Sequence, residues 1–248
     1  MQQDLKMYIN ELELESSAII DDYQTRGPVE TVEGAEQSFV SNKSIVSFAS
    51  SVSAKHRNDI LDSTLLAQLA ANKKFPEENE NIEWYKTFTE VLSNIGWIVE
   101  DSEFSNFEAN EDVFEMKAAI IGIITAAFGS NFVGIITKTM EAIKGLGDEN
   151  GTIIAFKKNT QTLQKGCFQI ALAVEENDTI SLQMGVFFLE SKNRITQILF
   201  FKSSKDSTKL TYNSRRATLH GERYSVVRDT VAKKLGEEIQ KNISEIEI

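Results

Sequence analysis

The sequence is poor in the residues on which most catalytic and metal-binding sites depend. Its 248 residues include one cysteine, two histidines and two prolines. The single cysteine, Cys167, excludes an internal disulfide framework, so stability should not depend on an oxidising compartment. Residues 1–6 lack the basic start and the apolar core of a signal peptide. We therefore expect a protein that is made in the cytoplasm and that leaves the cell, if it does, by a non-classical route.

Catalytic patterns are also missing from the sequence. It contains no phosphate-binding glycine loop, no Gly-x-Ser-x-Gly elbow and no zinc-ligand spacing. His56 stands beside a predicted helix with Asp59 and Asp62, but a metal site there would lack a second nitrogen or sulfur ligand. An exposed surface histidine is the simpler interpretation. We interpret His220 as a loop residue and Cys167 as a small core residue of a strand. The sequence therefore predicts no enzyme activity, no cofactor and no metal.

Negative charge is concentrated in the first part of the chain. The formal net charge is −11; residues 1–150 carry 11 basic and 26 acidic side chains, and residues 151–248 carry 15 and 11. We expect residues 1–36, which are acidic, to form a flexible arm or pro-segment before a single domain at residues 37–248. Between Lys192 and Arg228 there are nine basic residues and two acidic ones. A solvated sheet face and a surface for anionic lipid headgroups both explain this stretch.

The longest uncharged segment covers residues 118–137, twenty residues between Lys117 and Lys138. Its length would allow a membrane span. The Gly129-Ser130-Asn131 triplet favours a turn instead, so we expect two short apolar helices at about 113–128 and 132–145. Glycine costs about 1 kcal/mol relative to alanine inside a helix. The small residues would therefore suit either helices that detach or helices that pack closely on a sheet, and both interpretations stay open.

Apolar spacing predicts further helices. Leu61, Leu65 and Leu69 repeat every four residues, which is typical of one helix face and places a helix at residues 53–73. Similar patterns predict helices at about 82–94 and 224–243, and a short strand at 97–99. Residues 152–164 fit either a helix or a strand.

The period then changes to two, which is typical of strands. Four strands are predicted, at residues 168–174, 180–188, 195–201 and 209–218, joined by polar turn-forming loops. Residues 186–189 and 198–201 are apolar on both faces, so we expect these two strands to be central and covered on both sides. The predicted fold class is α/β of the α+β type. It is a single domain with a central antiparallel β-meander covered on both faces by helix pairs.

Three segments follow the two apolar helices. They read Gln-Ile-Ala-Leu-Ala-Val-Glu-Glu-Asn-Asp-Thr (169–179), Gly-Val-Phe-Phe-Leu-Glu (185–190) and Ile-Leu-Phe-Phe-Lys-Ser-Ser-Lys-Asp-Ser (198–207). With the helix pair, this region at about 112–219 resembles the Cyt-type cytolytic δ-endotoxins. The resemblance implies a helix hairpin on each face of a sheet, and action on membranes by lipid binding followed by departure of helices from the sheet. The acidic N-terminus and the block from Trp84 to Trp97 do not match that family.

These observations predict a membrane-binding protein, pore-forming or cytolytic, that binds a lipid surface and detaches apolar helices from a sheet. The residues expected to enter the membrane are Ile120, Ile121, Ile124, Phe128, Phe132, Ile135 and Ile136. Those expected to contact anionic headgroups are Lys202, Lys205, Lys209, Arg215 and Arg216. The expected partners are a lipid membrane with anionic headgroups and further copies of the chain, whereas the negative net charge disfavours nucleic acid. A non-enzymatic binding module for an acyl chain or other apolar ligand, and a structural or cargo protein of a larger assembly, remain alternatives.

Overall fold

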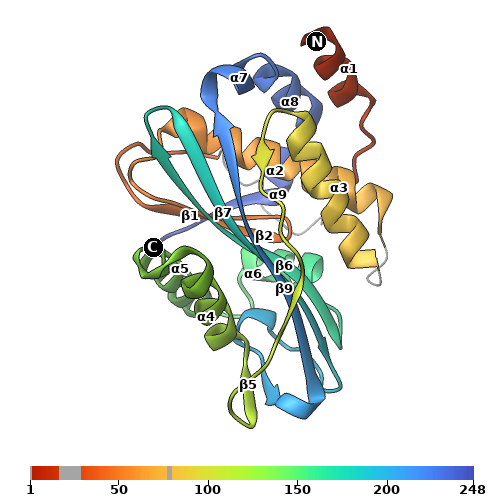
Figure 1. Cartoon of the computed structure of the whole chain (residues 1–248), viewed down its shortest axis with the longest axis vertical. Helices are drawn as coiled ribbons and strands as arrows, with labels where there is room; N and C mark the ends of the chain where they lie inside the picture. Colours follow the sequence, from red (N-terminus) through yellow and green to blue (C-terminus); the bar gives the residue numbers. More distant parts are fainter. Residues whose placement is uncertain (1, 17–28, 77–79) are drawn as a thin grey trace.

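A mixed sheet of eight strands forms the centre of the protein (Figure 1). The computed structural model describes residues 2–16, 29–76 and 80–248, and all structural statements refer to these residues. Residues 17–28, in the middle of the predicted acidic arm, lie outside them. The strand order is β10-β1-β2-β6-β7-β9-β3, with β4 also paired to β9. The bounds are β1 Gln37–Ser41, β2 Ser44–Phe48, β3 Ile98–Val99, β4 Ser105–Phe107, β6 Lys165–Glu176, β7 Thr179–Ser191, β9 Thr208–His220 and β10 Ile243–Ile246.

The three long strands β6, β7 and β9 pair antiparallel, as the alternating pattern predicts. The predicted turn between β6 and β7 is confirmed: Asn177 and Asp178 have φ values of 50° and 59°. Such left-handed pairs match the twist of a two-residue hairpin. Residues 186–189 are buried in β7, between β6 and β9, so the central position predicted for this strand is confirmed. The other sheet neighbours are also antiparallel, except β2 and β6, which run parallel.

The strand predicted at residues 195–201 is wrong. Ile198–Phe200 forms a 3₁₀ turn, η3, and Ile198 and Leu199 are buried beneath the sheet. The chain then forms β8 (Lys202–Ser204), which pairs with β5 (Val113–Glu115) in a separate two-stranded sheet. A second short turn, η4 (Lys205–Ser207), leads into β9. A short apolar run indicates burial without distinguishing a strand from a buried turn, which explains the error.

Nine helices lie in the described residues. They are α1 Gln2–Glu11, α2 Ala54–Lys74, α3 Asn81–Asn94, α4 Met116–Phe128, α5 Val133–Leu146, α6 Gly151–Thr160, α7 Gly221–Ser225, α8 Arg228–Leu235 and α9 Glu238–Asn242. The helices predicted at 53–73, 82–94 and 132–145 are confirmed, and the ambiguous segment 152–164 is mainly helical. The helix predicted at 113–128 begins only at Met116, because Val113–Glu115 pairs with β8 as strand β5. The continuous helix predicted at 224–243 is wrong, since Gly236 has a φ of 53° and separates α8 from α9.

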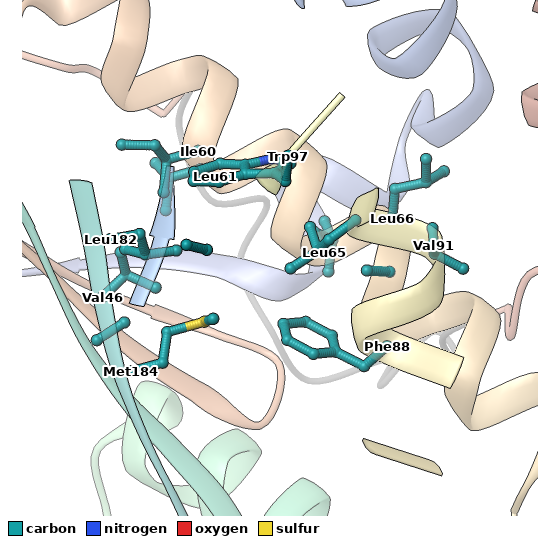
Figure 2. Close-up of a cluster of buried hydrophobic side chains, with 14 of the residues drawn as sticks. Val46, Ile60, Leu61, Leu65, Leu66, Phe88, Val91, Trp97, Leu182 and Met184 are labelled. Carbon is teal, nitrogen blue, oxygen red and sulfur yellow. The ribbon is translucent and has the colours of Figure 1, made fainter. Parts of the chain in front are cut away.

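Helices cover both faces of the sheet, and each face has its own core. On the first face, α2 and α3 pack with α8 against the even-numbered side chains of β7; Figure 2 shows Leu182 and Met184 directed towards Leu65 and Phe88. On the second face, α4, α5 and α6 cover the odd-numbered side chains of β7, including Phe187. The structure is thus a single α+β domain, as the sequence predicts, although the sheet is mixed and extends beyond the meander.

The described part of the N-terminal segment packs on the first face. Ile9 of α1 is buried, and the Lys234 Nζ on α8 donates a hydrogen bond to the carbonyl oxygen of Asn10 at 2.7 Å. Further along, the Glu15 N–H donates to the carbonyl oxygen of Leu69 at 3.0 Å. These contacts tie the start of the chain to α8 and α2.

Candidate functional site

The uncharged segment forms a helical hairpin on the second face. Helix α4 ends at Gly129, whose φ is 88°, and a 3₁₀ turn, η2 (Ser130–Phe132), leads into α5. This is the turn that the Gly129-Ser130-Asn131 triplet predicts. No helix among the described residues is long and apolar enough to cross a bilayer. The hairpin lies at the lower left of Figure 1, beside the sheet.

The predicted membrane residues divide into two groups by burial. The side chains of Ile120, Ile124 and Ile136 are buried against the sheet. Four others are half-buried at the flanks of the hairpin: Ile121, Phe128, Phe132 and Ile135. The structure therefore brings all seven together on one hairpin. The three buried side chains cannot reach lipid unless the hairpin moves away from the sheet.

Within residues 118–137, the outward side of the hairpin is uncharged and made of small residues. Its exposed residues are Ala118, Gly122, Thr125, Ala126, Ala127, Gly129, Ser130 and Gly134; the later part of α5 exposes the charged Lys138, Glu141 and Lys144. A Cβ added at Gly122 or Gly134 would meet no atom within 4 Å, so close packing does not require glycine at these two positions. For Gly122 and Gly134, the close-packing interpretation is therefore not supported.

The underside of α5 contains hydroxyl groups within an otherwise apolar contact. Thr139 Oγ1 lies 2.7 Å from Ser38 Oγ on β1 and 3.2 Å from Ser47 Oγ on β2. All three side chains are buried. Hydrogen bonds between neutral groups contribute only about 0.5–1.5 kcal/mol net to stability. This contact therefore specifies where α5 sits but holds it less strongly than an all-apolar contact of the same area would.

Ion pairs close both ends of the uncharged segment. Lys117 pairs with Glu141 across the hairpin, and Lys138 Nζ lies 2.7 Å from Glu36 Oε2. Lysine contact with Glu141 lowers the pKa of that carboxyl. Glu36 belongs to the segment predicted as an acidic arm, so part of that segment contacts the hairpin. Exposed pairs of this kind are weak, about 0–1 kcal/mol each, and salt screens them further.

The predicted headgroup residues follow β8 and β9. We call Lys202, Lys205, Lys209 and Arg216 the basic ridge; all four are exposed. Arg215 is different, since its Nη2 donates to the Ser102 carbonyl oxygen at 3.1 Å and its guanidinium lies 4.8 Å from the centre of the Tyr85 ring. Through these contacts, Arg215 links β9 to the segment around Ser102 that crosses the strand.

An acidic segment of the same chain covers the basic ridge. Residues 100–115, here called the acidic strap, contain seven carboxylates and no basic residue. In Figure 1 the strap runs along β9 from β3 to β5. Lys205 Nζ lies 2.9 Å from Asp112 Oδ1, Lys202 pairs with Glu115, and Arg216 Nη1 lies 4.0 Å from Glu100 Oε1.

The strap is also fixed by backbone pairing and aromatic packing. Strand β4 pairs with β9, and Ser102 Oγ donates to the Ser214 carbonyl oxygen at 2.8 Å. The Phe104 ring stacks on Phe188 with centroids 5.2 Å apart and meets Tyr85 edge-on at 5.6 Å. Sequence reasoning identified the basic ridge but missed the strap. The available signal was the run of seven carboxylates, whose partners are about a hundred residues away.

The titratable residues of α2 do not form the arrangement that their spacing suggests. Asp59 is buried and accepts two hydrogen bonds from Arg228, at 2.5 and 2.7 Å. Burial raises the pKa of Asp62 to about 7, with a further contribution from the charge of Asp59. The interpretation of His56 as an exposed surface residue is wrong: its exposed fraction is 4%. Its imidazole lies between two carboxylates that belong to other segments. The charged neighbour Lys55 suggests an exposed position instead.

The prediction for Cys167 is confirmed, and the prediction for His220 is wrong. Cys167 is a buried residue of β6, and burial raises the pKa of its thiol to about 11, so the core role is confirmed. His220 is exposed but is the last residue of β9 rather than a loop residue. A cavity of about 70 Å³ lies beside Cys167 and is lined by Lys43, Trp84 and several amide side chains. Ligand pockets are usually about 300–1,000 Å³, so this cavity does not fit an acyl chain.

Comparison with known proteins finds likeness in structure but not in sequence. No family model matches the chain, and no curated protein matches it. Several solved structures match it in fold, among them the following three. The activated Cyt2Ba monomer from Bacillus thuringiensis subsp. israelensis matches with a TM-score of 0.33 and 10% identity, over 55% of this chain and 79% of that one.

The other two likenesses extend over more of the chain. A δ-endotoxin matches with a TM-score of 0.38 and 13% identity, over 83% of this chain and 91% of that one. The Evf virulence factor matches with a TM-score of 0.41 and 15% identity, over 96% of this chain and 90% of that one. The partial resemblance to Cyt-type toxins that the sequence indicates is therefore found in the structure as well. Each TM-score is below 0.5, and no function is carried over from these proteins.

Proposed function

We propose that this protein binds anionic lipid membranes, without catalysing a reaction, by releasing the α4–α5 hairpin from the second face of the sheet. The observation that carries the proposal is the hairpin itself: twenty uncharged residues, 118–137, form two helices with isoleucines inward and small residues outward. The uncharged outward side of residues 118–137 can approach lipid before any rearrangement. The inward isoleucines then supply the apolar surface that a membrane would receive.

The free energies favour transfer of the hairpin from the sheet to lipid. Burying an isoleucine side chain stabilises by about 1.5–3 kcal/mol, so the buried Ile120, Ile124 and Ile136 hold the hairpin by roughly 5–9 kcal/mol together. In water this cost keeps the hairpin on the sheet. Lipid tails are as apolar as the protein core, so contact with them restores most of the burial free energy of these isoleucines. On leaving the sheet, the hairpin then gives up the Thr139 hydroxyl bonds and the exposed Lys138–Glu36 ion pair, which are individually weak, whereas the Lys117–Glu141 pair lies within the hairpin and moves with it.

The basic ridge supports the choice of anionic lipid. A basic residue near an anionic surface contributes about 1 kcal/mol, and the ridge offers Lys202 and Lys205 just before β9, with Lys209 and Arg216 on opposite faces of that strand. In the structure the acidic strap occupies Lys202, Lys205 and Arg216. Anionic headgroups would compete with strap carboxylates for the same cations. Binding should therefore be stronger at low salt, where the long-range attraction is least screened.

A reversible covalent lock tests the proposal. Ser38 Oγ and Thr139 Oγ1 are 2.7 Å apart, so cysteines at these positions should form a disulfide that ties α5 to β1. The reduced Ser38→Cys/Thr139→Cys protein should release dye from anionic vesicles as the wild type does. The oxidised protein should release none, and reduction should restore the activity. Single variants Ser38→Cys and Thr139→Cys, treated identically, are the controls.

Two results would contradict the proposal. Folded wild-type protein that neither binds anionic vesicles nor releases their contents would remove the membrane function. Equal leakage by oxidised and reduced double variants would keep a membrane function but exclude release of α5 from the sheet. Replacing Ile124 by a charged residue is a poorer test, because Ile124 is buried and the variant would be destabilised.

A further inference from the structure

A group of potential metal ligands lies on the first face, where three segments meet. His56 is in the first turn of α2, Glu175 is near the end of β6, and Asp178 is in the β6–β7 turn. One ligand atom from each side chain lies within 4.8 Å of the other two. An imidazole nitrogen and two carboxylate oxygens form a donor set suited to divalent transition metals such as Zn²⁺ and Mn²⁺.

One oxygen of the Glu175 carboxylate accepts hydrogen bonds that orient the group, and the other oxygen faces His56. Its Oε2 accepts hydrogen bonds from the Ser53 N–H at 2.9 Å and from Ser53 Oγ at 3.1 Å. Its Oε1 lies 2.9 Å from His56 Nδ1. In metal sites, ligating carboxylates are commonly held in this way by hydrogen bonds from groups outside the ligand set.

His56 is the second observation that points to a ligand. Its side chain is about 95% buried, and its Nδ1 has no aligned hydrogen bond although Glu175 Oε1 is close. Two ligands at about 2.1 Å from one metal ion and at right angles to each other lie about 3 Å apart. The separation of Nδ1 and Oε1 fits this spacing. A cation bound between Nδ1 and Oε1 would give this buried ring nitrogen the partner that the hydrogen-bond geometry does not supply.

Asp178 completes the group from the exposed side. Its Oδ1 lies 3.5 Å from His56 Nε2, and its side chain is 57% exposed. A Cβ on residue 221 would lie 2.4 Å from His56 Nε2 and 3.1 Å from Asp178 Oδ1, so only Gly221 allows these groups to approach the α7 backbone. One imidazole gives a single ion only one of its nitrogens, so an ion held by Nδ1 and Oε1 is joined by Asp178 when this exposed carboxylate turns from the Nε2 side of the ring, and water fills the remaining coordination positions.

We propose that His56, Glu175 and Asp178 bind a divalent transition-metal cation, for which Zn²⁺ is the probe. Two carboxylates and a neutral imidazole carry a charge of −2, which the cation neutralises. The ion would join the start of α2 to the β6–β7 hairpin beside α7. This proposal does not depend on membrane binding, since the site is on the first face and involves no residue of the hairpin.

Calorimetric titration of the full-length protein with Zn²⁺ tests the site, and the chain offers a matched control. His220 is the only other histidine and is exposed. Wild type and His220→Gln should bind one Zn²⁺ with equal affinity and show equal increases in melting temperature. His56→Gln and Asp178→Asn should bind at least about tenfold more weakly. Because Asp178 is exposed at a turn where asparagine is also tolerated, the second variant should fold even if the first does not.

Cobalt gives an independent readout of the coordination. Co²⁺ added to the wild type should produce visible absorption bands that Zn²⁺ displaces, and Asp178→Asn should weaken them. Absence of one-to-one binding by the wild type would overturn the proposal. So would loss of binding in His220→Gln, or unchanged binding in Asp178→Asn.

Discussion

The helix layers on the two faces of the sheet are built from different side chains, and under the proposed function this difference decides which layer leaves the sheet. On the first face, the Trp84 ring stacks on Phe88 with centroids 5.6 Å apart, and the ion pair between buried Asp59 and half-buried Arg228 links α2 to α8. On the second face, the sheet supplies its own stacked rings, Phe168 and Phe187, whereas α4 and α5 bury isoleucine, methionine and alanine, with the Thr139 hydroxyl cluster beneath. The helices of the first face are thus held by aromatic and charged side chains, whereas α4 and α5 are held mainly by aliphatic ones.

The buried Arg57 shows how strongly the first face is specified. Its guanidinium donates to Gln37 Oε1 at 2.6 Å and to the carbonyl oxygens of Val52 and Ala35. These bonds tie the start of α2 to the loop before β1. Hydrogen bonds from a charged guanidinium contribute about 1.5–3 kcal/mol each, more than the neutral hydroxyl bonds beneath α5, so detachment costs more here than on the second face.

The largest effect should come from breaking the first face. Phe88 is fully buried against Trp84 and Tyr85, so Phe88→Ala should lower the free energy of unfolding by about 3–5 kcal/mol. Urea unfolding measures it. Ile82→Ala, on the same helix but 45% exposed, should change the value by no more than about 0.5 kcal/mol. Similar decreases in both variants would mean that α3 is held by something other than this aromatic core.

The next effect sharpens the comparison by locating a weak point within the first face. The raised pKa of Asp62, about 7, means that the folded protein binds more protons than the unfolded chain between about pH 4 and 7. The free energy of unfolding therefore falls as pH rises through this window, and the penalty is complete above it.

Asp62→Asn should remove that penalty. It should raise the free energy of unfolding by up to about 4 kcal/mol at pH 8 and leave it nearly unchanged at pH 4. Urea unfolding at both pH values provides the measurement, with the exposed Asp229→Asn on α8 as the control. An equal gain at pH 4 and pH 8 would contradict the titration of Asp62.

A third, smaller effect concerns the acidic strap. Asp112→Asn with Glu115→Gln would free Lys205 and Lys202, and at about 1 kcal/mol each the affinity for anionic vesicles should rise by roughly 30-fold at low salt. Vesicle sedimentation at low and high salt measures the change. Glu83→Gln with Glu90→Gln makes the same change in net charge on α3. An equal gain there would attribute the effect to net charge rather than to the strap.

The smallest effect concerns the helices of the second face. Gly122→Ala adds a methyl group with no neighbour within 4 Å and should raise the free energy of unfolding by about 0.5–1 kcal/mol. If α4 leaves the sheet as an intact helix, vesicle leakage should not change, because the helix gains equally in both positions. Reduced leakage would show instead that α4 unwinds during release.

Sequence periodicity predicted α2, α3 and the α4–α5 hairpin because each depends on a local apolar pattern. It missed β1 and β2, whose residues include Ser38 and Ser47; these serines are buried since Thr139, a hundred residues away, supplies their hydrogen bonds. It placed residues 195–201 in the sheet because apolar runs predict burial rather than backbone shape.

The candidate site was predictable in its apolar part and not in its charged part. The hairpin residues are contiguous, so one uncharged run identified them. The strap and the basic ridge are complementary only after folding, because Asp112 and Lys205 are distant in sequence. His56 shows the same limit, since its carboxylate neighbours Glu175 and Asp178 come from another element.

The most direct test of the account is the distance between the two helix layers when lipid is present. Spin labels at Ala126→Cys on α4 and Lys86→Cys on α3 lie at exposed positions on opposite faces, and the native Cys167 is buried. With anionic vesicles the label-to-label distance should lengthen and its distribution broaden. Labels at Lys73→Cys and Lys86→Cys, both on the first face, should keep one distance. An unchanged distance between residues 126 and 86 on vesicle-bound protein would contradict release of the hairpin.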